Sequence, residues 1–424
     1  MSNASRLNSL SALTRREMLG ASLAFIPAVS AWAGPSAGRK KIAAVITEYR
    51  FNSHADVIIT RLLEGYEYDG IRRTPQVEIV SMYTDQVPAN DISRDMAAKH
   101  NVRIYPTIRE ALTGGGGKLA VEGVVLIGEH GKYPTNEKGQ MLYPRYELYS
   151  KIIETFKETK RAVPVFTDKH MSVDWDKAKW MYDQSRQLKF PLMAGSSLPL
   201  AWRIPPLELE MGAPVERAVA AFYGGKESYG FHLLEALQCI VERRKGGETG
   251  IASVQCLEGA PVWEWTDANP WAGRLLECGL SRCPDRKQGN PRANVKQPIL
   301  FIIEYRSGLQ AAAYLLNGHI DTTCFAADIK GQSEPVSTQI WLQSGRPFSH
   351  FSNLVYFIEQ MMVTGKPAYP VERTLLTTGA LAALMDSSYQ KGKKLETPYL
   401  KIAYKAQKES LFNRGPVAAL EKKA

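Results

Sequence analysis

Cysteine is scarce in this sequence: only five occur among 424 residues, and their spacing matches no metal-binding pattern. An odd number argues against a complete disulfide framework. Zinc-finger spacing, helix-turn-helix signals and basic-aromatic motifs are absent, so the sequence predicts no nucleic-acid binding. The net charge of +10 is scattered rather than grouped, which is typical of a solvated basic surface. With 44% hydrophobic and 23% charged residues, the composition is that of a globular protein long enough for two domains.

The first 33 residues have the order of a twin-arginine export signal. Arg15 and Arg16 precede an apolar run at 21–29, and small residues at 31–33 supply a cleavage point. The apolar run is too short for a membrane span. We therefore expect residues 1–33 to be removed and the protein to reach the periplasm or the cell envelope, with residues 34–40 as a linker.

Residues 41–170 alternate between short apolar runs and amphipathic helical patterns. This alternation predicts βαβ units and a Rossmann-like parallel sheet. Residues 171–390 contain several alternating strands around a helical segment at 230–244, which predicts an α+β domain with a large open, mostly antiparallel sheet. An exposed face of that sheet could make a homo-oligomer. Residues 391–424 are expected to form a C-terminal strand and a polar tail.

Glycine is missing where a dinucleotide fingerprint would place it, directly after the first predicted strand. The turn at 47–54 reads TEYRFNSH, and its side chains would crowd the close backbone approach that glycines permit. An acid that could bind a ribose follows the second strand. If NAD or NADP binds here, the candidate cofactor-binding residues are Thr47, Glu48, Tyr49, Asn52 and Asp85.

Polar side chains follow three predicted strands, at the edge of a parallel sheet where ligands bind. After the last of these strands come Asp168, Lys169 and His170 in the stretch VFTDKH. Such an inventory suits a general acid and base pair, or a divalent metal ion as an alternative. A third interpretation is that these are solvated loop residues without a role in catalysis or metal binding. The metal-ligand candidates are Glu48, Glu129, His130 and His170.

A second imidazole comes from the helix in the C-terminal domain. His232 lies near the start of that helix, and Ser228 precedes it by four residues on the same face. Helix packing is the alternative explanation for His232.

The sequence resembles the Gfo/Idh/MocA family of oxidoreductases over roughly residues 40–400. The clearest part is YFIEQMMVTGKPAYPVERTLLTTGALAALMDSSYQKGKKLETP, and the short unit VRIYPTIREAL agrees in order. The resemblance implies a Rossmann domain beside a larger open-sheet domain, and transfer of a hydride from a sugar or cyclitol to NAD(P). It places the family's E-K-P lysine on Lys169, between Asp168 and His170. The D-x-x-x-H histidine falls on His232, with Ser228 in place of the aspartate.

These observations give three hypotheses. The first is an exported oxidoreductase acting on a sugar, glycoside or polyol, with Lys169, His232, Asp168 and Ser228 as the catalytic set. The second is a lyase or hydrolase that acts on a glycoside in the same crevice by acid-base or metal-assisted chemistry. The third is a carbohydrate-binding envelope protein without turnover.

Overall fold

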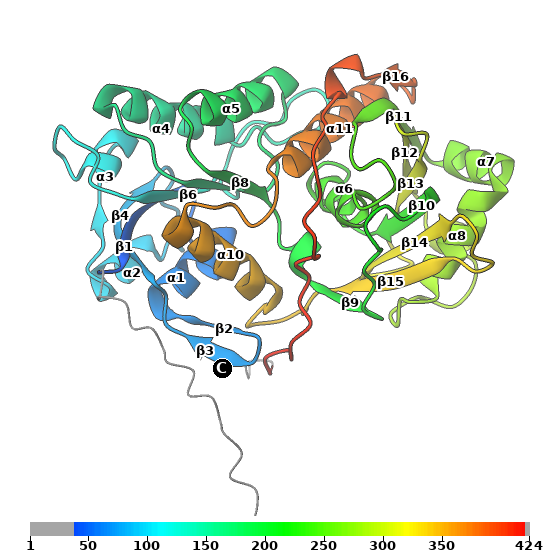
Figure 1. Ribbon diagram of the computed structural model, residues 1–424, viewed down its shortest axis with the longest axis horizontal. Helices are drawn as coiled ribbons and strands as arrows, with labels where there is room; N and C mark the ends of the chain where they lie inside the picture. Colours follow the sequence, from blue (N-terminus) through cyan, green and yellow to red (C-terminus); the bar gives the residue numbers. More distant parts are fainter. Residues whose placement is uncertain (1–37, 420–424) are drawn as a thin grey trace, which may run out of the picture. The chain divides into compact units, whose positions relative to one another are not determined.

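The computed structural model describes residues 38–419. The predicted export signal, residues 34–37 of the predicted linker and the end of the polar tail (420–424) lie outside the described residues. Residues 39–419 contain two large sheets and a small hairpin of β2 (Tyr66–Tyr68) and β3 (Ile71–Arg73). Both large sheets and their helices can be followed in Figure 1.

The first sheet has six parallel strands in the order β5-β4-β1-β6-β7-β8, as expected for a Rossmann-like domain. Its strands are β1 (Lys40–Ile46), β4 (Val77–Thr84), β5 (Arg103–Ile104), β6 (Gly123–Ile127), β7 (Val165–Asp168) and β8 (Leu192–Gly195). The connecting helices are a π-helix (Asp56–Thr60) continuing into α1 (Arg61–Glu64), α2 (Ser93–Lys99), α3 (Ile108–Thr113), α4 (Arg145–Thr159) and α5 (Trp175–Gln187).

Residues 42–46 of β1 are apolar without interruption because helices bury both faces of the sheet. Ile42 and Ile46 pack with the π-helix, α1 and α10 (His350–Thr364), whereas Ala43 and Val45 face α3 and α4. Figure 1 shows α4 and α5 on one side of this sheet and α1 and α10 on the other. The period of two along the strand therefore determines which helices each residue contacts.

Two segments cross the predicted domain boundary after residue 170. Strand β8 pairs in parallel with β7, so the first sheet extends to Gly195. Helix α10, from the predicted C-terminal domain, covers one face of this same sheet. The predicted boundary after residue 170 does not separate the two sheets, because α5 and β8 complete one more βαβ unit of the first sheet and the contacts of α10 are not local in the sequence.

The second sheet has eight strands in the order β16-β11-β12-β13-β10-β14-β15-β9. All neighbouring pairs are antiparallel except β10 and β13, so the predicted mostly antiparallel sheet is confirmed. Its strands are β9 (Trp202–Ile204), β10 (Val215–Phe222), β11 (Ile251–Glu258), β12 (Ile299–Tyr305), β13 (Gln310–Leu315), β14 (Thr323–Ile329), β15 (Val336–Trp341) and β16 (Leu395–Glu396).

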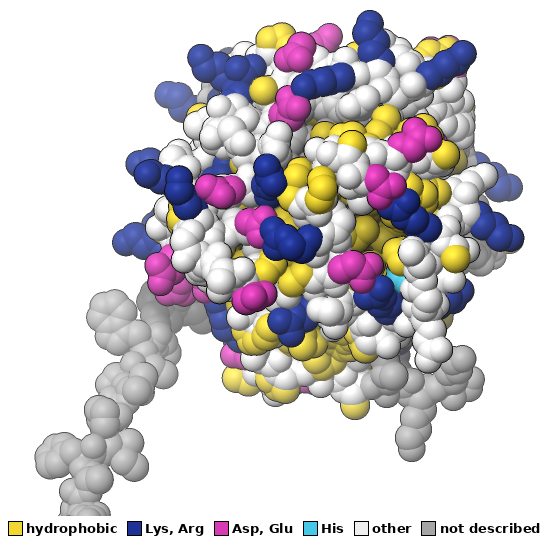
Figure 2. Space-filling view, turned by 90° about the vertical axis from the view of Figure 1, so that its right-hand side faces the viewer, with side chains coloured by type: hydrophobic (Ala, Val, Ile, Leu, Met, Phe, Trp, Pro, Cys, Tyr) yellow, Lys and Arg dark blue, Asp and Glu magenta, His cyan; other side chains and the backbone are white. Residues whose placement is uncertain are grey.

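Helices cover both faces of the second sheet. Phe222 packs toward α6 (Ser228–Val241) and α11 (Glu372–Tyr389), whereas Val219, on the other face of β10, packs against α8 (Pro270–Leu280). The sequence predicted an exposed sheet face, but α8 and its neighbour α7 (Ala260–Ala268) cover it. Charged side chains are interspersed with apolar ones on this side of the molecule (Figure 2). The homo-oligomer stays a prediction.

The remaining elements are short. They are the 3-10 helices at Leu198–Leu200 and Pro398–Leu400 and the helix α9 (Pro291–Asn294). Among residues 38–419, no helix combines the length and the apolarity that crossing a bilayer requires.

Candidate active site

A cleft of about 530 Å³ lies where the carboxyl ends of β1, β6 and β7 meet the start of α6. Its lining includes side chains from both sheets and their connections. Acid-base groups are concentrated in it: His54, Glu129, His130, Lys169 and His232. Of the polar residues that follow the three predicted strands, His54, Glu129, His130 and Lys169 therefore lie together in this cleft.

The backbone after β7 sends two consecutive side chains in different directions. Lys169 has a left-handed backbone (φ 67°), and its amide donates to the carbonyl oxygen of Gly195 at 3.0 Å. Left-handed backbone is uncommon for a residue with a Cβ and is found where surrounding structure enforces it. As a result, Asp168 points toward the first βα turn, while Lys169 reaches α6.

Lys169 and His232 are in direct contact. The Lys169 Nζ atom lies 2.6 Å from His232 Nε2, and 3.9 Å from Glu129 Oε1. Lys169 is only 7% exposed. Burial, together with the positive charge of Lys169, holds the pKa of His232 well below its usual range. His232 is therefore the neutral acceptor and Lys169 the donor in this pair.

Glu129 supplies the negative charge beside Lys169. Burial alone would raise the pKa of the Glu129 carboxyl, but the charges of Lys169 and Arg145 outweigh it and hold that pKa below its usual value. Arg145 forms an ion pair with Glu129 from the start of α4. Gly128 makes room for this arginine, because a Cβ at Gly128 would lie 2.6 Å from Arg145 Cγ.

Ser228 lies where the family pattern has an aspartate. It is exposed at the first position of α6 and lines the cleft. The Nδ1 atom of His232 is buried and has no hydrogen-bond partner among the described residues. Ser228 therefore does not orient the imidazole in the way that a carboxylate would.

His170 belongs to a different network behind the cleft. Its Nε2 atom lies 2.7 Å from Glu227 Oε1 and 3.0 Å from Arg145 Nη1, and the side chain is 2% exposed. Arg145 thus joins Glu129 to His170. Sequence reasoning missed Arg145 and Glu227 in this role, since charged residues in a polar loop and beside a helix start carry no distinguishing signal.

The four metal-ligand candidates do not form a metal site. Glu48 pairs with Arg50 at 2.5 Å, and His130 Nδ1 lies 3.3 Å from Arg50 Nη2. Glu129 and His170 are bound to Arg145 and to their other partners. Within residues 38–419, no group of three or more His, Cys, Asp or Glu side chains is arranged to hold a metal ion. The metal alternative is not supported.

A second titratable pair connects the first turn to β7. The Nδ1 atom of His54 lies 2.6 Å from Asp168 Oδ2. Asp168 has no exposed surface, while His54 lines the cleft. The catalytic candidate Asp168 therefore reaches the cleft only through His54.

The five predicted cofactor-binding residues have different environments. Thr47 is buried and donates to the carbonyl oxygen of Glu129 at 2.7 Å, and Tyr49 is buried with its hydroxyl 2.7 Å from Thr60 Oγ1. Asp85 is exposed beyond β4 and accepts from Tyr133 at 2.7 Å. Asn52 lines the cleft, whereas Glu48, paired with Arg50, does not.

The first turn does not fit the pyrophosphate of a dinucleotide. The amide of Asn52 donates to Asp56 Oδ2 at 2.8 Å, and the same oxygen accepts from Arg346 Nη1 at 2.8 Å. Asp56 thus places a buried carboxylate at the helix start, where a pyrophosphate needs free amides. Arg346 comes from the segment between β15 and α10, so sequence reasoning had no signal for this contact.

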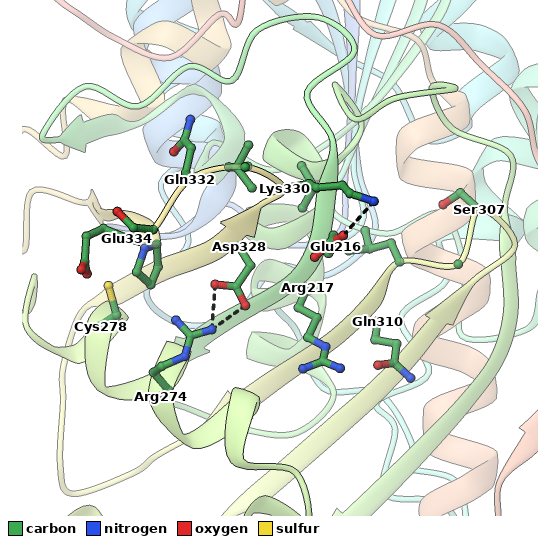
Figure 3. A pocket seen from close by; sticks show the side chains of 17 residues that line it. Glu216, Arg217, Arg274, Cys278, Ser307, Gln310, Asp328, Lys330, Gln332 and Glu334 are labelled. Carbon is green, nitrogen blue, oxygen red and sulfur yellow. Dashed lines mark hydrogen bonds and ion pairs between the residues drawn. The ribbon is translucent and has the colours of Figure 1, made fainter.

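A larger hollow of about 1090 Å³ lies at one end of the second sheet (Figure 3). Four of its charged side chains form two pairs, Arg274 with Asp328 at 2.6 Å and Lys330 with Glu216 at 3.9 Å. No histidine lines it. We therefore place the candidate active site in the cleft around Lys169, where unlike titratable groups converge.

The comparisons with known proteins establish the fold. No protein-family model and no curated protein matches this chain. The structure of GenD2 from gentamicin A biosynthesis, solved in complex with NAD, matches with a TM-score of 0.54 and 12% identity over 86% of this chain and 97% of that chain.

Two further solved structures match with TM-scores of 0.50. One is a probable dehydrogenase from Thermotoga maritima, with 9% identity over 85% of this chain and 99% of that chain. The other is a putative NADPH-dependent oxidoreductase from Desulfitobacterium hafniense, with 12% identity over 85% and 98%. The chain therefore has the fold of the Gfo/Idh/MocA-type oxidoreductases, as its sequence resemblance predicted.

Proposed function

We propose that this protein is an enzyme of the oxidoreductase type that acts on a hydroxyl-bearing substrate such as a sugar, glycoside or polyol. The observation that carries the proposal is the contact of Lys169 with His232 inside a cleft that two sheets form together. A buried ammonium group beside a neutral imidazole is suited to proton transfer at an oxygen atom.

The substrate oxygen takes the place of Lys169 as the partner of His232 Nε2. His232 then accepts the hydroxyl proton, and the Lys169 ammonium group stabilises the negative charge that develops on the oxygen. Glu129 keeps Lys169 in position. Tyr143, Asp321 and Thr322 supply further hydrogen-bonding groups in the cleft, which suits a polyhydroxylated substrate.

The shared fold supports the redox assignment, because GenD2 was solved with NAD. The first turn argues against the usual dinucleotide position, because Asp56 and Arg346 use that position themselves. We therefore assign only the proton transfer to residues of this chain and derive no step through a nicotinamide.

That same turn favours a second candidate function, a lyase or hydrolase that uses the acid-base groups of the cleft without hydride transfer. Titration calorimetry with NAD, NADH, NADP and NADPH separates the two candidates. Binding that responds to Lys169→Met supports the redox function. Turnover of a glycoside panel without any dinucleotide supports the second candidate.

The Lys169→Met variant tests both functions at once. We expect turnover to fall by about two to four orders of magnitude while the circular dichroism spectrum stays unchanged. Lys177→Met is the matched control, since Lys177 is 44% exposed in a surface ion pair with Glu147. Full activity in Lys169→Met contradicts the assignment of this cleft.

Export by the twin-arginine route to the periplasm or cell envelope is part of this proposal. It is supported by the order of the segments in residues 1–33. N-terminal sequencing of the protein from the cell envelope tests it. A new N-terminus near residue 34 is expected, and replacement of Arg15 and Arg16 by lysines should leave the protein unprocessed.

A further inference from the structure

His54 has the environment of a general base on the wall of the cleft. Asp168, which has no exposed surface, holds His54 Nδ1 at 2.6 Å. The rings of His130 and Phe351 lie 5.4 and 5.2 Å from the His54 ring and restrict its rotation. The imidazole is thus held by one hydrogen bond and by two ring contacts.

The hydrogen bond determines which nitrogen of His54 can accept a proton. An ionised carboxylate only accepts hydrogen bonds, so Nδ1 donates to Asp168. The lone pair is then on Nε2, which forms no hydrogen bond with any residue in the range 38–419. Because His54 lines the cleft and its Nδ1 is bound to Asp168, Nε2 is the ring nitrogen left for a substrate.

Lys169 follows Asp168 in the chain, but its Nζ atom contacts His232 of α6 instead of His54. The cleft therefore holds an imidazole with an available nitrogen and, separately, a buried ammonium donor. We propose that His54, oriented by Asp168, is a catalytic base that removes a proton from a substrate carbon next to a carbonyl group, while Lys169 binds the carbonyl oxygen. The substrate class is an α-hydroxy ketone or aldehyde form of a sugar.

The proposed step balances without an oxidant. The C–H bond breaks, the proton moves to His54 Nε2, and its electron pair forms the carbon-carbon double bond of an enolate. The enolate oxygen carries the negative charge beside the Lys169 ammonium group, and Asp168 stabilises the imidazolium. The proton of the neighbouring hydroxyl group moves to the enolate oxygen, and His54 Nε2 returns its proton to the former carbonyl carbon, which becomes an alcohol while the neighbouring carbon becomes the new carbonyl, so that an isomerisation is complete. This inference rests on the proposed function because both use Lys169 in one cleft.

Solvent exchange tests the proposal with two defined probes, dihydroxyacetone and D-xylulose. We expect the full-length protein in D₂O to exchange their carbon-bound α-protons, followed by proton NMR, faster than buffer alone. His54→Gln should lower the exchange rate by about a hundredfold or more. Asp168→Asn should lower it by about ten- to a hundredfold, since the amide no longer enforces the tautomer. His100→Gln is the control, as His100 contacts Glu64 away from the cleft.

The outcomes separate this proposal from the proposed function. Exchange no faster than buffer, or equal exchange in the wild type and His54→Gln, overturns the role of His54. Loss of exchange in Lys169→Met with full exchange in His54→Gln overturns the inference and leaves the proposed function standing. Full exchange in Lys169→Met together with loss in His54→Gln contradicts the proposed role of Lys169.

The tautomer of His54 supplies a readout that requires no variant. Nitrogen-15 NMR of the wild type, above the ordinary titration range of imidazole, should show a proton on Nδ1 and none on Nε2. A proton on Nε2 overturns the proposal, because that nitrogen could not accept one from the substrate.

Discussion

Asp168 and Lys169 are consecutive residues that bind histidines from two different parts of the fold. Asp168 Oδ2 lies 2.6 Å from His54 Nδ1, and Lys169 Nζ lies 2.6 Å from His232 Nε2. The left-handed backbone at Lys169 makes this divergence possible. One strand end thus connects the first βα turn to helix α6, and the chemistry of the cleft depends on it.

Ser228→Asp should supply the carboxylate that His232 lacks. An aspartate four residues before a histidine on a helix can reach its ring, and His232 Nδ1 is buried without a described partner. The charged groups that act on His232 are Lys169, His54, His170 and Glu129. The added negative charge should raise the pKa of His232, so the acid limb of the activity profile should move to higher pH. A pH profile unchanged from the wild type would contradict this prediction.

His350 should make the protein less stable as the pH falls. Burial first, and then the charges of Arg61 and His54, lower the pKa of His350 to about 3. The unfolded chain takes up a proton near the ordinary imidazole pKa of about 6.5, while the folded state does not. Stability is therefore complete above that pH and falls by about 1.4 kcal/mol per pH unit below it, until the pH reaches the folded pKa.

Urea unfolding of the wild type and His350→Gln at several pH values measures this effect. As the pH falls, the free energy of unfolding should decrease more for the wild type than for His350→Gln. A difference that does not depend on pH would rule out His350 as the source.

Arg373→Met should destabilise the fold by about 3–5 kcal/mol, because it leaves a buried carboxylate without its partner. Arg373 binds Glu242 through two hydrogen bonds of 2.8 and 2.5 Å, and their side chains are only 4% and 2% exposed. Replacing Glu242 with leucine in the same chain should recover part of the loss. Arg109→Met removes an exposed pair and should change the melting temperature little.

Leu275→Ala tests whether α8 is part of the core of the second sheet. Leu275 is completely buried among the residues that join α8 to the sheet. The substitution should lower the free energy of unfolding by about 2–5 kcal/mol. Leu142→Ala, at a side chain that is 36% exposed, is the matched control and should have little effect. Equal effects of the two substitutions would show that α8 is only loosely attached.

The sequence by itself predicted the alternation of strands and helices along the chain as far as β7, and the place of Lys169 at a strand end. Alternation of strands and helices is a local pattern, and βαβ units fold with a fixed handedness. Lys169 and His232 were also identified from the sequence, through short motifs that do not depend on distant contacts. The boundary after residue 170 failed because β8 and α10 return to the first sheet from later in the chain.

Only the tertiary structure decided which polar residues act together. His54 meets Asp168 across 114 positions in the sequence, and Arg346 reaches Asp56 across 290. Helix α8 covers the sheet that was expected to be bare. Local propensity and periodicity describe contacts between neighbours, whereas pairs at such separations form only when the whole core has packed. The sequence predicted individual candidate residues. The packing of the two sheets decided which residues contact each other, and therefore which chemistry the cleft can perform.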